Sequence, residues 1–104
     1  MQFTVYSNTG KSVIYPLLLD VTSDIIGQLN RRVVIPLLPV ERYPSGTRPE
    51  RLLPLIKLAD NKGYVVMTHE MASIPSRSLG MVFCDASLYR TEIKAAIDFL
   101  FDGI

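Results

Sequence analysis

The sequence predicts a mainly β fold of the α+β class, a small antiparallel sheet or barrel closed by one C-terminal helix. Short apolar stretches alternate with turn residues at intervals of about 8–12 residues, which is typical of short strands. Only Ala86–Asp102 has helical periodicity, because its apolar residues recur at three- to five-residue spacings. Those residues are Leu88, Ile93, Ala96, Ile97, Leu100 and Phe101. A chain of 104 residues fits one domain, so residues 1–104 are interpreted as a single domain.

The first third of the chain is predicted to be extended. Gln2–Tyr6 alternates polar and apolar residues, and Tyr15–Val21 is a second apolar segment. Arg31–Val40 is a longer apolar run that contains Pro36 and Pro39. Because proline cannot donate to a central ladder, we expect an edge, a bulge or a bend there.

Loops and short strands are predicted to alternate in the middle of the chain. Glu41–Arg51 is rich in proline, serine and glycine, and is interpreted as the longest loop. Leu52–Leu58 and Gly63–Thr68 are predicted strands joined by a tight turn at residues 60–63. Met71–Pro75 is interpreted as irregular, and Arg77–Phe83 as a last short strand.

The C-terminal end of the predicted helix is the most informative part of the sequence. Asp85 or Ser87 is expected to cap it through a side-chain oxygen. Gly103 and Ile104 follow it, so the helix ends in an apolar tip. Such a tip is either a docked closing element or a probe offered to a partner.

The composition excludes several classes of protein. Hydrophobic residues make up 48 % of the chain, which argues against disorder. Eleven basic and ten acidic side chains give a net charge of +1, which weighs against a general nucleic-acid binder. Cys84 is the only cysteine, so no internal disulfide is expected, and a cytoplasmic location is predicted. No signal peptide and no membrane-spanning run are apparent in the sequence.

Candidate catalytic groups are few. His69 is the only histidine and is interpreted as structural or solvent-facing. One histidine and one cysteine cannot supply the usual zinc ligands, and no phosphate-binding loop is present. We therefore predict a protein that is not an enzyme, with no catalytic residue, no metal site and no cofactor.

Several side chains admit two interpretations. Asp20 and Asp24 are close enough in sequence for acid–base work, although turn capping is favoured. Arg31 and Arg32 would point to opposite faces of a strand, so solvated or ion-paired roles are favoured over a phosphate grip. One of the Ile25–Ile26 pair should face solvent and mark a partner surface, with a core position as the alternative. Core filling is predicted for three methionines, Met67, Met71 and Met81.

Five short blocks, spread from the first residue to the last, carry a family resemblance. They are Met1–Tyr6, Leu19–Ile26, Arg31–Leu37, Met71–Pro75, and Glu92–Ile97 with the terminal Gly103–Ile104. In this order they resemble the CcdB family, the toxins of the CcdA–CcdB toxin–antitoxin systems.

The resemblance implies an SH3-like antiparallel barrel with a small extra sheet and a C-terminal helix. It implies a homodimer built from that helix and neighbouring strands. It further implies a toxin that binds the A subunit of DNA gyrase and traps the gyrase–DNA cleavage complex. A CcdA-like antitoxin would wrap the toxin with a disordered tail, and the pair would repress its own operon, with the DNA contacts made by the antitoxin. No membrane partner is implied.

The resemblance also implies which residues touch gyrase. The matching positions are Ile25, Ile26, Phe101, Gly103 and Ile104, with Asp98 and Asp102 beside them on the helix. The best-known member has tryptophan where this chain has Asp102, and asparagine where it has Asp98. An aspartate cannot replace a buried aromatic anchor, but it can pair with an arginine of the partner.

The antitoxin is expected to bind the long loop and a turn near the N-terminus. The predicted residues are Asn8, Glu41, Arg42, Tyr43, Pro44, Ser45, Gly46, Thr47 and Arg48. Exposed segments without regular pairing often carry function.

Two other functions remain open at the sequence level. The same fold is shared by the ribonuclease toxins MazF and Kid, but near-neutral charge and a single histidine argue against RNA cleavage. A decayed homologue would bind antitoxin without poisoning gyrase, which Asp98 and Asp102 motivate.

Overall fold

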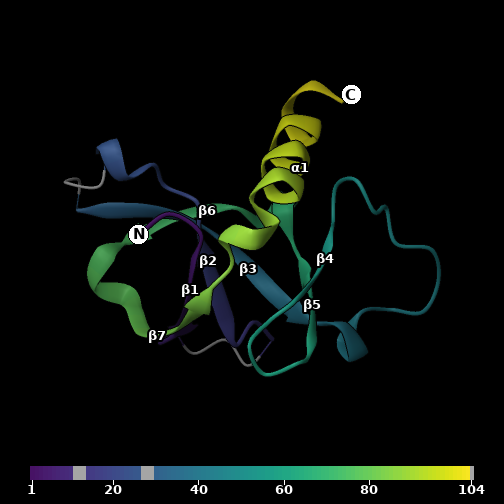
Figure 1. Cartoon of the computed structure of the whole chain (residues 1–104), viewed down its shortest axis with the longest axis horizontal. Helices are drawn as coiled ribbons and strands as arrows, with labels where there is room; N and C mark the ends of the chain where they lie inside the picture. The colour runs from purple at the N-terminus through teal and green to yellow at the C-terminus, as the bar shows by residue number, and fades with distance from the viewer. Residues whose placement is uncertain (11–13, 27–29, 104) are drawn as a thin grey trace.

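Antiparallel pairing organises the protein. The computed structural model describes residues 1–10, 14–26 and 30–103, without the side chain of Ile26. Among these residues, seven strands form one sheet, and the C-terminal helix α1 follows the last strand (Figure 1). The prediction of a mainly β, α+β fold is confirmed. None of the described helices is long and apolar enough to cross a bilayer.

The elements follow one another in a simple order. The strands and helix are β1 (Thr4–Asn8), β2 (Leu17–Asp20), β3 (Arg31–Pro39), β4 (Leu55–Lys57), β5 (Gly63–Val66), β6 (Ala72–Pro75), β7 (Leu79–Asp85) and α1 (Arg90–Asp102). Short 3₁₀ turns lie between them: η1 (Asp24–Ile26), η2 (Val40–Arg42), η3 (Thr68–Glu70), η4 (Ser76–Ser78) and η5 (Ser87–Tyr89). The strand order is β4-β5-β3-β2-β1-β7, and β6 pairs with β3.

Strand β3 is central and continuous, so the expected edge or bend at its prolines is wrong. On one side, residues 31–34 pair with β6 and residues 37–39 pair with β5. Pro36 lies between these two partners, and its carbonyl accepts the Met67 N–H at 3.1 Å. The missing N–H would point to the same side, where no ladder bond is required. Pro39 ends the strand.

Three other predicted boundaries need correction. Residues 72–75, expected to be irregular, form β6 because they pair with the first half of β3. The last strand begins at Leu79 rather than Arg77, since η4 occupies residues 76–78. The predicted helix begins only at Arg90, and its N-cap Tyr89 makes no side-chain cap, so neither Asp85 nor Ser87 caps α1. The Asp85 carboxylate instead accepts the Ser87 N–H at 3.3 Å, before the helix begins.

The larger core lies on the face of the sheet that α1 covers. Its buried members are Phe3, Val5, Leu17, Leu19, Ile35, Leu37, Ile56, Leu58, Tyr64, Val66, Ala86 and Ile93. Ala96 is also buried, and Ile97 packs against this core. Leu88 and Phe101, assigned to the same stripe by periodicity, are exposed. Leu88 belongs to η5, and Phe101 lies in the last turn of α1. The C-terminal end of α1 extends away from the sheet (Figure 1). Met81 on β7 is also exposed, so the expectation that it fills the core is wrong.

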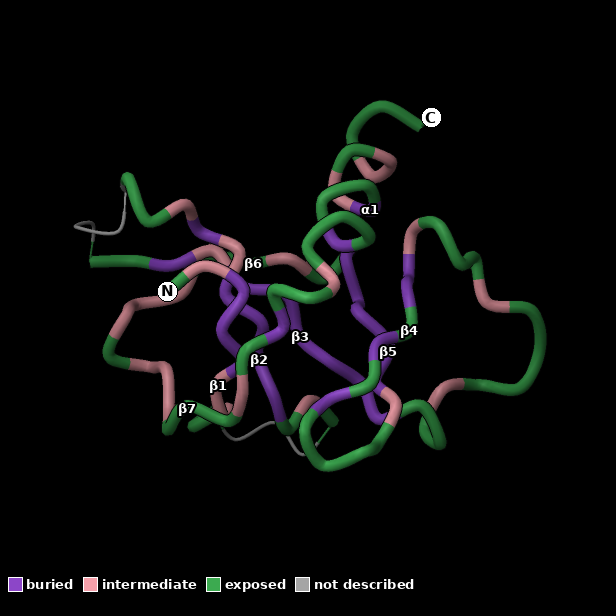
Figure 2. The backbone as a smooth tube through the Cα atoms, viewed as in Figure 1, coloured by how far each residue is buried: buried purple, intermediate pink, exposed green. Residues whose placement is uncertain are grey.

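A smaller core lies on the opposite face. It contains Leu38, Leu53, Val65 and Met67, with Tyr15, Tyr43 and Leu52 packed at its margin. Residues that alternate along β3 therefore divide between the two cores. On β2, Leu17 and Leu19 belong to the larger core, whereas Leu18 lines a groove on the other face. Figure 2 shows the buried strands at the centre and the exposed loop and helix end at the periphery.

A buried ion pair joins β2 to β3. Asp20 is fully buried, and its carboxylate lies 2.7 Å from the Arg32 guanidinium. The other carboxylate oxygen accepts the Thr22 N–H at 2.9 Å, as a turn cap does. Arg31 points the other way and donates to Ser73. The favoured interpretations of these arginines, and of Asp20 as a turn cap, are confirmed.

Candidate partner-binding surfaces

The end of α1 is an exposed apolar and acidic tip. Phe101 is 71 % exposed, and Asp98 and Asp102 are exposed beside it. Gly103 adopts a left-handed conformation with φ of 72°, and its N–H donates to the Phe99 carbonyl at 2.8 Å. This cap ends the helix cleanly. Ile104, also predicted to bind gyrase, lies outside the described residues.

The second predicted gyrase contact lies on η1. Ile25 is 93 % exposed, so the expectation that one isoleucine of the pair faces solvent is confirmed. Its N–H donates to the Ser23 hydroxyl at 3.2 Å, and Asp24 accepts the Gln2 N–H at 3.0 Å. These bonds hold the turn against the N-terminal segment. The side chain of Ile26 lies outside the description.

The predicted gyrase contacts on α1 and those on η1 do not lie together within one chain. Figure 1 shows η1 at one end of the sheet and the tip of α1 away from it. A cavity of about 180 Å³ lies beside α1, lined by Gln2, Phe3, Val21, Lys94, Ile97 and Asp98. The Gln2 amide also donates to the Val21 carbonyl at 3.3 Å. Of the residues that line this cavity only Asp98 was predicted as a contact residue from the sequence, although Lys94 lies one helical turn before it.

The long loop, residues 41–51, is exposed in its middle, but other residues of it contact the rest of the protein. Residues 44–47 are exposed, but Tyr43 packs against the smaller core, and Arg48 donates to the Leu53 carbonyl. Arg42 donates to the Ile14 carbonyl at 3.4 Å. The start of the loop is thus attached to the segment that follows the N-terminal turn, whereas its exposed part extends away from the sheet (Figure 1).

Asn8 shapes its turn with both ends of its amide. Its nitrogen donates to the Tyr15 carbonyl at 2.8 Å, and its oxygen accepts the Gly10 N–H at 2.9 Å. These contacts use the amide inside the protein. Asn8 therefore helps to shape the wall of the neighbouring groove, and its part in binding an antitoxin stays a prediction.

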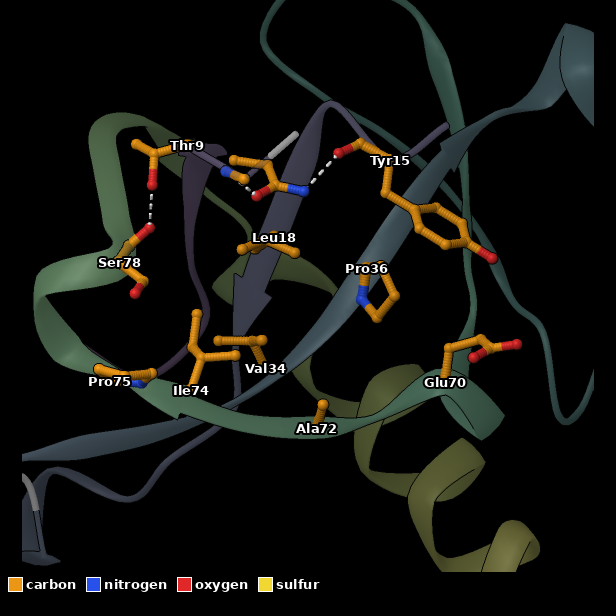
Figure 3. Close-up of a pocket in the computed structure, with 12 residues that line it drawn as sticks. Thr9, Tyr15, Leu18, Val34, Pro36, Glu70, Ala72, Ile74, Pro75 and Ser78 are labelled. Carbon is orange, nitrogen blue, oxygen red and sulfur yellow. Dashed lines mark hydrogen bonds between the residues drawn. The ribbon is translucent and has the colours of Figure 1, made fainter. Parts of the chain in front are cut away.

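A groove of about 520 Å³ lies beside this turn (Figure 3). Leu18, Val34 and Pro36 form part of its lining from β2 and β3. Its other lining residues are Asn8, Thr9, Gly10, Tyr15, Glu70, Ala72, Ile74, Pro75 and Ser78. Of these residues only Asn8 was predicted from the sequence to bind a partner, because the lining comes from segments that are far apart in the chain. The alternation of β2 was the available signal, since it directs Leu18 away from the larger core.

The charge in the groove is acidic. Burial and the nearby Glu70 carboxylate raise the pKa of the Tyr15 hydroxyl above its usual value of 10.0. His69, exposed as expected, lies 3.7 Å from the same carboxylate. Among the described residues, no three His, Cys, Asp or Glu side chains group as metal ligands. The groove thus combines apolar walls with one carboxylate, an arrangement suited to binding a peptide with apolar and basic side chains.

An exposed tip, an exposed isoleucine and an apolar groove are features of a protein whose surfaces dock other macromolecules. The family model described as CcdB protein matches residues 2–103, and the chain belongs to the CcdB family. It is accordingly a toxin of a toxin–antitoxin system. The known role of this family is to poison DNA gyrase, rather than to act as an enzyme.

Proposed function

We propose that this protein binds the A subunit of DNA gyrase and traps the gyrase–DNA cleavage complex. The observation that carries the proposal is the exposed tip of α1 in a chain that matches the CcdB family over residues 2–103. An exposed phenylalanine next to a left-handed glycine gives a partner an apolar anchor and close access to the backbone.

The tip suits a basic pocket on gyrase. Phe101 supplies apolar area, while Asp98 and Asp102 supply two carboxylates one helical turn apart on the same side of the helix. A charged pair with arginine at the rim of an interface contributes most to orientation and association rate. Binding should therefore weaken as ionic strength rises.

The proposed assembly is a homodimer through α1 and adjacent strands. Leu88 is a large apolar side chain in η5, directly before α1, that one chain leaves exposed. A two-fold axis near the helices would cover part of this surface and present two tips side by side. Ile25 would then belong to the same gyrase-facing side as the partner's tip.

The proposed antitoxin site combines the groove with the start of the long loop. The apolar walls near Leu18 and Ile74 fit aliphatic side chains, and Glu70 favours a basic residue of the antitoxin. Tyr43 and Tyr15 connect the loop to the groove through the smaller core. A disordered tail would gain order on this surface and relieve the toxicity. The toxin–antitoxin pair would then repress its operon, with the antitoxin contacting DNA.

Expression in two matched hosts tests the gyrase proposal. Killing is expected in a host with sensitive gyrase A and not in a strain whose gyrase A is resistant. Deleting Gly103 and Ile104, or changing Phe101→Ala, should abolish killing with little change in the melting temperature. Leu55→Ala, at another exposed leucine, is the matched control. Full killing by the truncated protein would place the active surface elsewhere.

A decayed toxin is the second candidate, because two carboxylates occupy the exposed tip. Such a protein would bind antitoxin without killing either host. Asp102→Trp separates the cases: restored killing would support loss of an aromatic anchor, whereas weaker gyrase binding would support pairing of Asp102 with an arginine. RNA cleavage by the purified chain without gyrase would instead indicate a ribonuclease toxin.

A further inference from the structure

The 3₁₀ turn η1 carries the most exposed large apolar side chain among the described residues. Ile25 is 93 % exposed, so little of its side chain packs against the protein. Its direction therefore depends on how the backbone of η1 is attached. The segment before η1 is fixed to β3, because the Thr22 hydroxyl accepts the Val33 N–H at 2.6 Å and donates to the Val33 carbonyl at 3.3 Å. The turn thus begins two residues after a fixed point.

The Asp24 carboxylate connects η1 to two other parts of the protein. One of its oxygens accepts the Gln2 N–H at 3.0 Å and lies 3.8 Å from the Arg32 guanidinium of β3. Within residues 1–10, 14–26 and 30–103, no other hydrogen bond or ion pair joins η1 to another element. The bond to Gln2 has an ordinary hydrogen-bond length, whereas 3.8 Å exceeds it, so the Gln2 bond is the stronger connection.

The N-terminal segment that Asp24 holds is itself rigid. The Phe3 N–H donates to the Asp20 carbonyl at 2.6 Å, and the Phe3 carbonyl accepts the Ala86 N–H at 2.8 Å. Phe3 has a φ of 64°, which is strained for a bulky residue, and its side chain is buried in the larger core. Such a conformation persists only where the surrounding contacts fix it. The Gln2 N–H next to it is therefore a firm anchor for η1.

The same segment packs beside α1. Gln2 and Phe3 line the small cavity together with Lys94 and Asp98 of the helix. The Arg90 guanidinium, at the start of α1, lies 5.9 Å from the centre of the Phe3 ring. The N-terminal segment is thus bonded to η1 on one side and packed against α1 on the other. The placement of η1 relative to α1 is set through this segment.

We infer that Asp24 is a positioning residue for the proposed gyrase contact: its carboxylate fastens η1 to the N-terminal segment and so holds Ile25 in one direction. The inference rests on the proposed binding of gyrase and adds to it a residue that acts through its neighbour. A contact residue that is ordered before binding loses less conformational freedom when the partner arrives, so the affinity is higher.

Binding of the purified gyrase A subunit, measured by calorimetry, tests this role. The Asp24 side chain is 59 % exposed, so Asp24→Ala should keep the fold but lower the affinity about tenfold, because η1 loses its anchor. Asp24→Asn keeps an oxygen that can accept the Gln2 N–H and should bind within about twofold of the wild type. Glu50→Ala removes the same charge from another exposed carboxylate and should leave the affinity unchanged.

Two results of this titration would overturn the inference. One is wild-type affinity in Asp24→Ala, and the other is an equal loss in Asp24→Asn and Asp24→Ala, which would mean that the bond to Gln2 does not hold η1.

A double-mutant cycle separates positioning from direct contact. Ile25→Ala should lower the affinity for gyrase A about tenfold. In that background Asp24→Ala should add less than about twofold, because the side chain that it positions is already gone. Fully additive losses would show that Asp24 itself contacts gyrase. Unchanged binding by Ile25→Ala would also overturn the inference, while leaving the proposal for the tip of α1 intact.

Nuclear magnetic resonance of the free protein separates this inference from the proposed function. The order parameter of the Ile25 N–H should be about 0.85 in the wild type and fall below about 0.6 in Asp24→Ala. The Val21 N–H, bonded to the Val33 carbonyl at 3.0 Å, should not change. If the wild type does not bind gyrase A, the proposed function is refuted, and the order parameters still decide whether Asp24 holds η1. Equal values at Ile25 in the two proteins would overturn the inference.

Discussion

The two faces of the sheet are covered to different extents. One face is covered by α1 and buries twelve residues in a continuous core. The other buries four residues in its core and leaves a groove of about 520 Å³ above β2 and β3 (Figure 3). The described residues contain one α-helix, and the face without it retains apolar surface that a partner can cover. Stability is thus expected to depend on the covered face and recognition on the open one.

A large-to-small substitution in the core beneath α1 should have the largest effect on stability. Ile93→Ala removes a fully buried side chain between α1 and the sheet, and should lower the free energy of unfolding by about 4 kcal/mol. Ile74→Ala in the groove should cost no more than about 1.5 kcal/mol, because Ile74 is already half-buried. Chemical denaturation of both variants measures the difference. Equal costs would mean that the two faces contribute alike.

Loss of the buried ion pair should have the second-largest effect on stability. Arg32→Ala leaves Asp20 without its closest cation and should cost about 3 kcal/mol. The lower end of the usual range applies because the Met1 amino group also lies 3.2 Å from that carboxylate. Arg31→Ala, one position along, is the matched control, since its side chain is exposed. A similar loss in both variants would show that burial of the pair is unimportant.

A pH-dependent hydrogen bond at the edge of the covered face should contribute less to stability than the ion pair. Burial and a 2.7 Å hydrogen bond to Asp60 raise the pKa of Tyr64 to about 12. Burial acts to raise the pKa of Asp60, but the Tyr64 hydroxyl and backbone N–H groups outweigh it, so that pKa is lowered. Tyr64→Phe should cost about 1 kcal/mol at neutral pH.

The sign of the pH effect follows from these shifts. A raised tyrosine pKa contributes stability that is complete below 10.0 and is lost as the pH rises towards about 12. The lowered pKa of Asp60 contributes stability that is lost as the pH falls below its usual value of 3.8. The difference in unfolding free energy between wild type and Tyr64→Phe should therefore shrink at both extremes. A constant difference from acid to alkali would refute this account.

The smallest effect is expected where the long loop touches the helix. The Arg51 guanidinium lies 4.6 Å from the centre of the Phe99 ring, so Arg51→Ala should cost about 0.5 kcal/mol. The Arg90 guanidinium lies 5.9 Å from the Phe3 ring, and Arg90→Ala should cost less. Thermal denaturation of the Arg51→Ala and Arg90→Ala variants measures which loses more stability. The reverse order would show that ring distance does not govern these contacts.

Local patterns predicted the elements whose partners are close in sequence. A tight turn joins β4 to β5 as expected, but it lies at residues 58–61 rather than 60–63, with the Asn61 N–H bonded to the Leu58 carbonyl at 2.9 Å. Strand alternation correctly separated Arg31 from Arg32. These features depend on chain geometry alone, so a single sequence contains the necessary information.

Features that depend on distant partners were not predictable. The groove is assembled from Thr9, Val34 and Ile74, whose proximity is set by strand order. Met81 is exposed because β7 shifts register against β1, which composition does not reveal. The sequence itself indicated an apolar tip at the end of α1, but helical periodicity assigned Phe101 to the buried stripe, and only the family resemblance indicated Phe101 as a contact residue.

Pro36 also restricts the ways in which this chain can misfold. If β5 slid along β3 towards β6, it would meet a position that has no N–H to offer, and the ladder would lose a bond. If β6 slid the other way, it would meet the same gap. The proline therefore marks the boundary between two neighbours that share one strand, and it disfavours misaligned sheets during folding as well as in the native state.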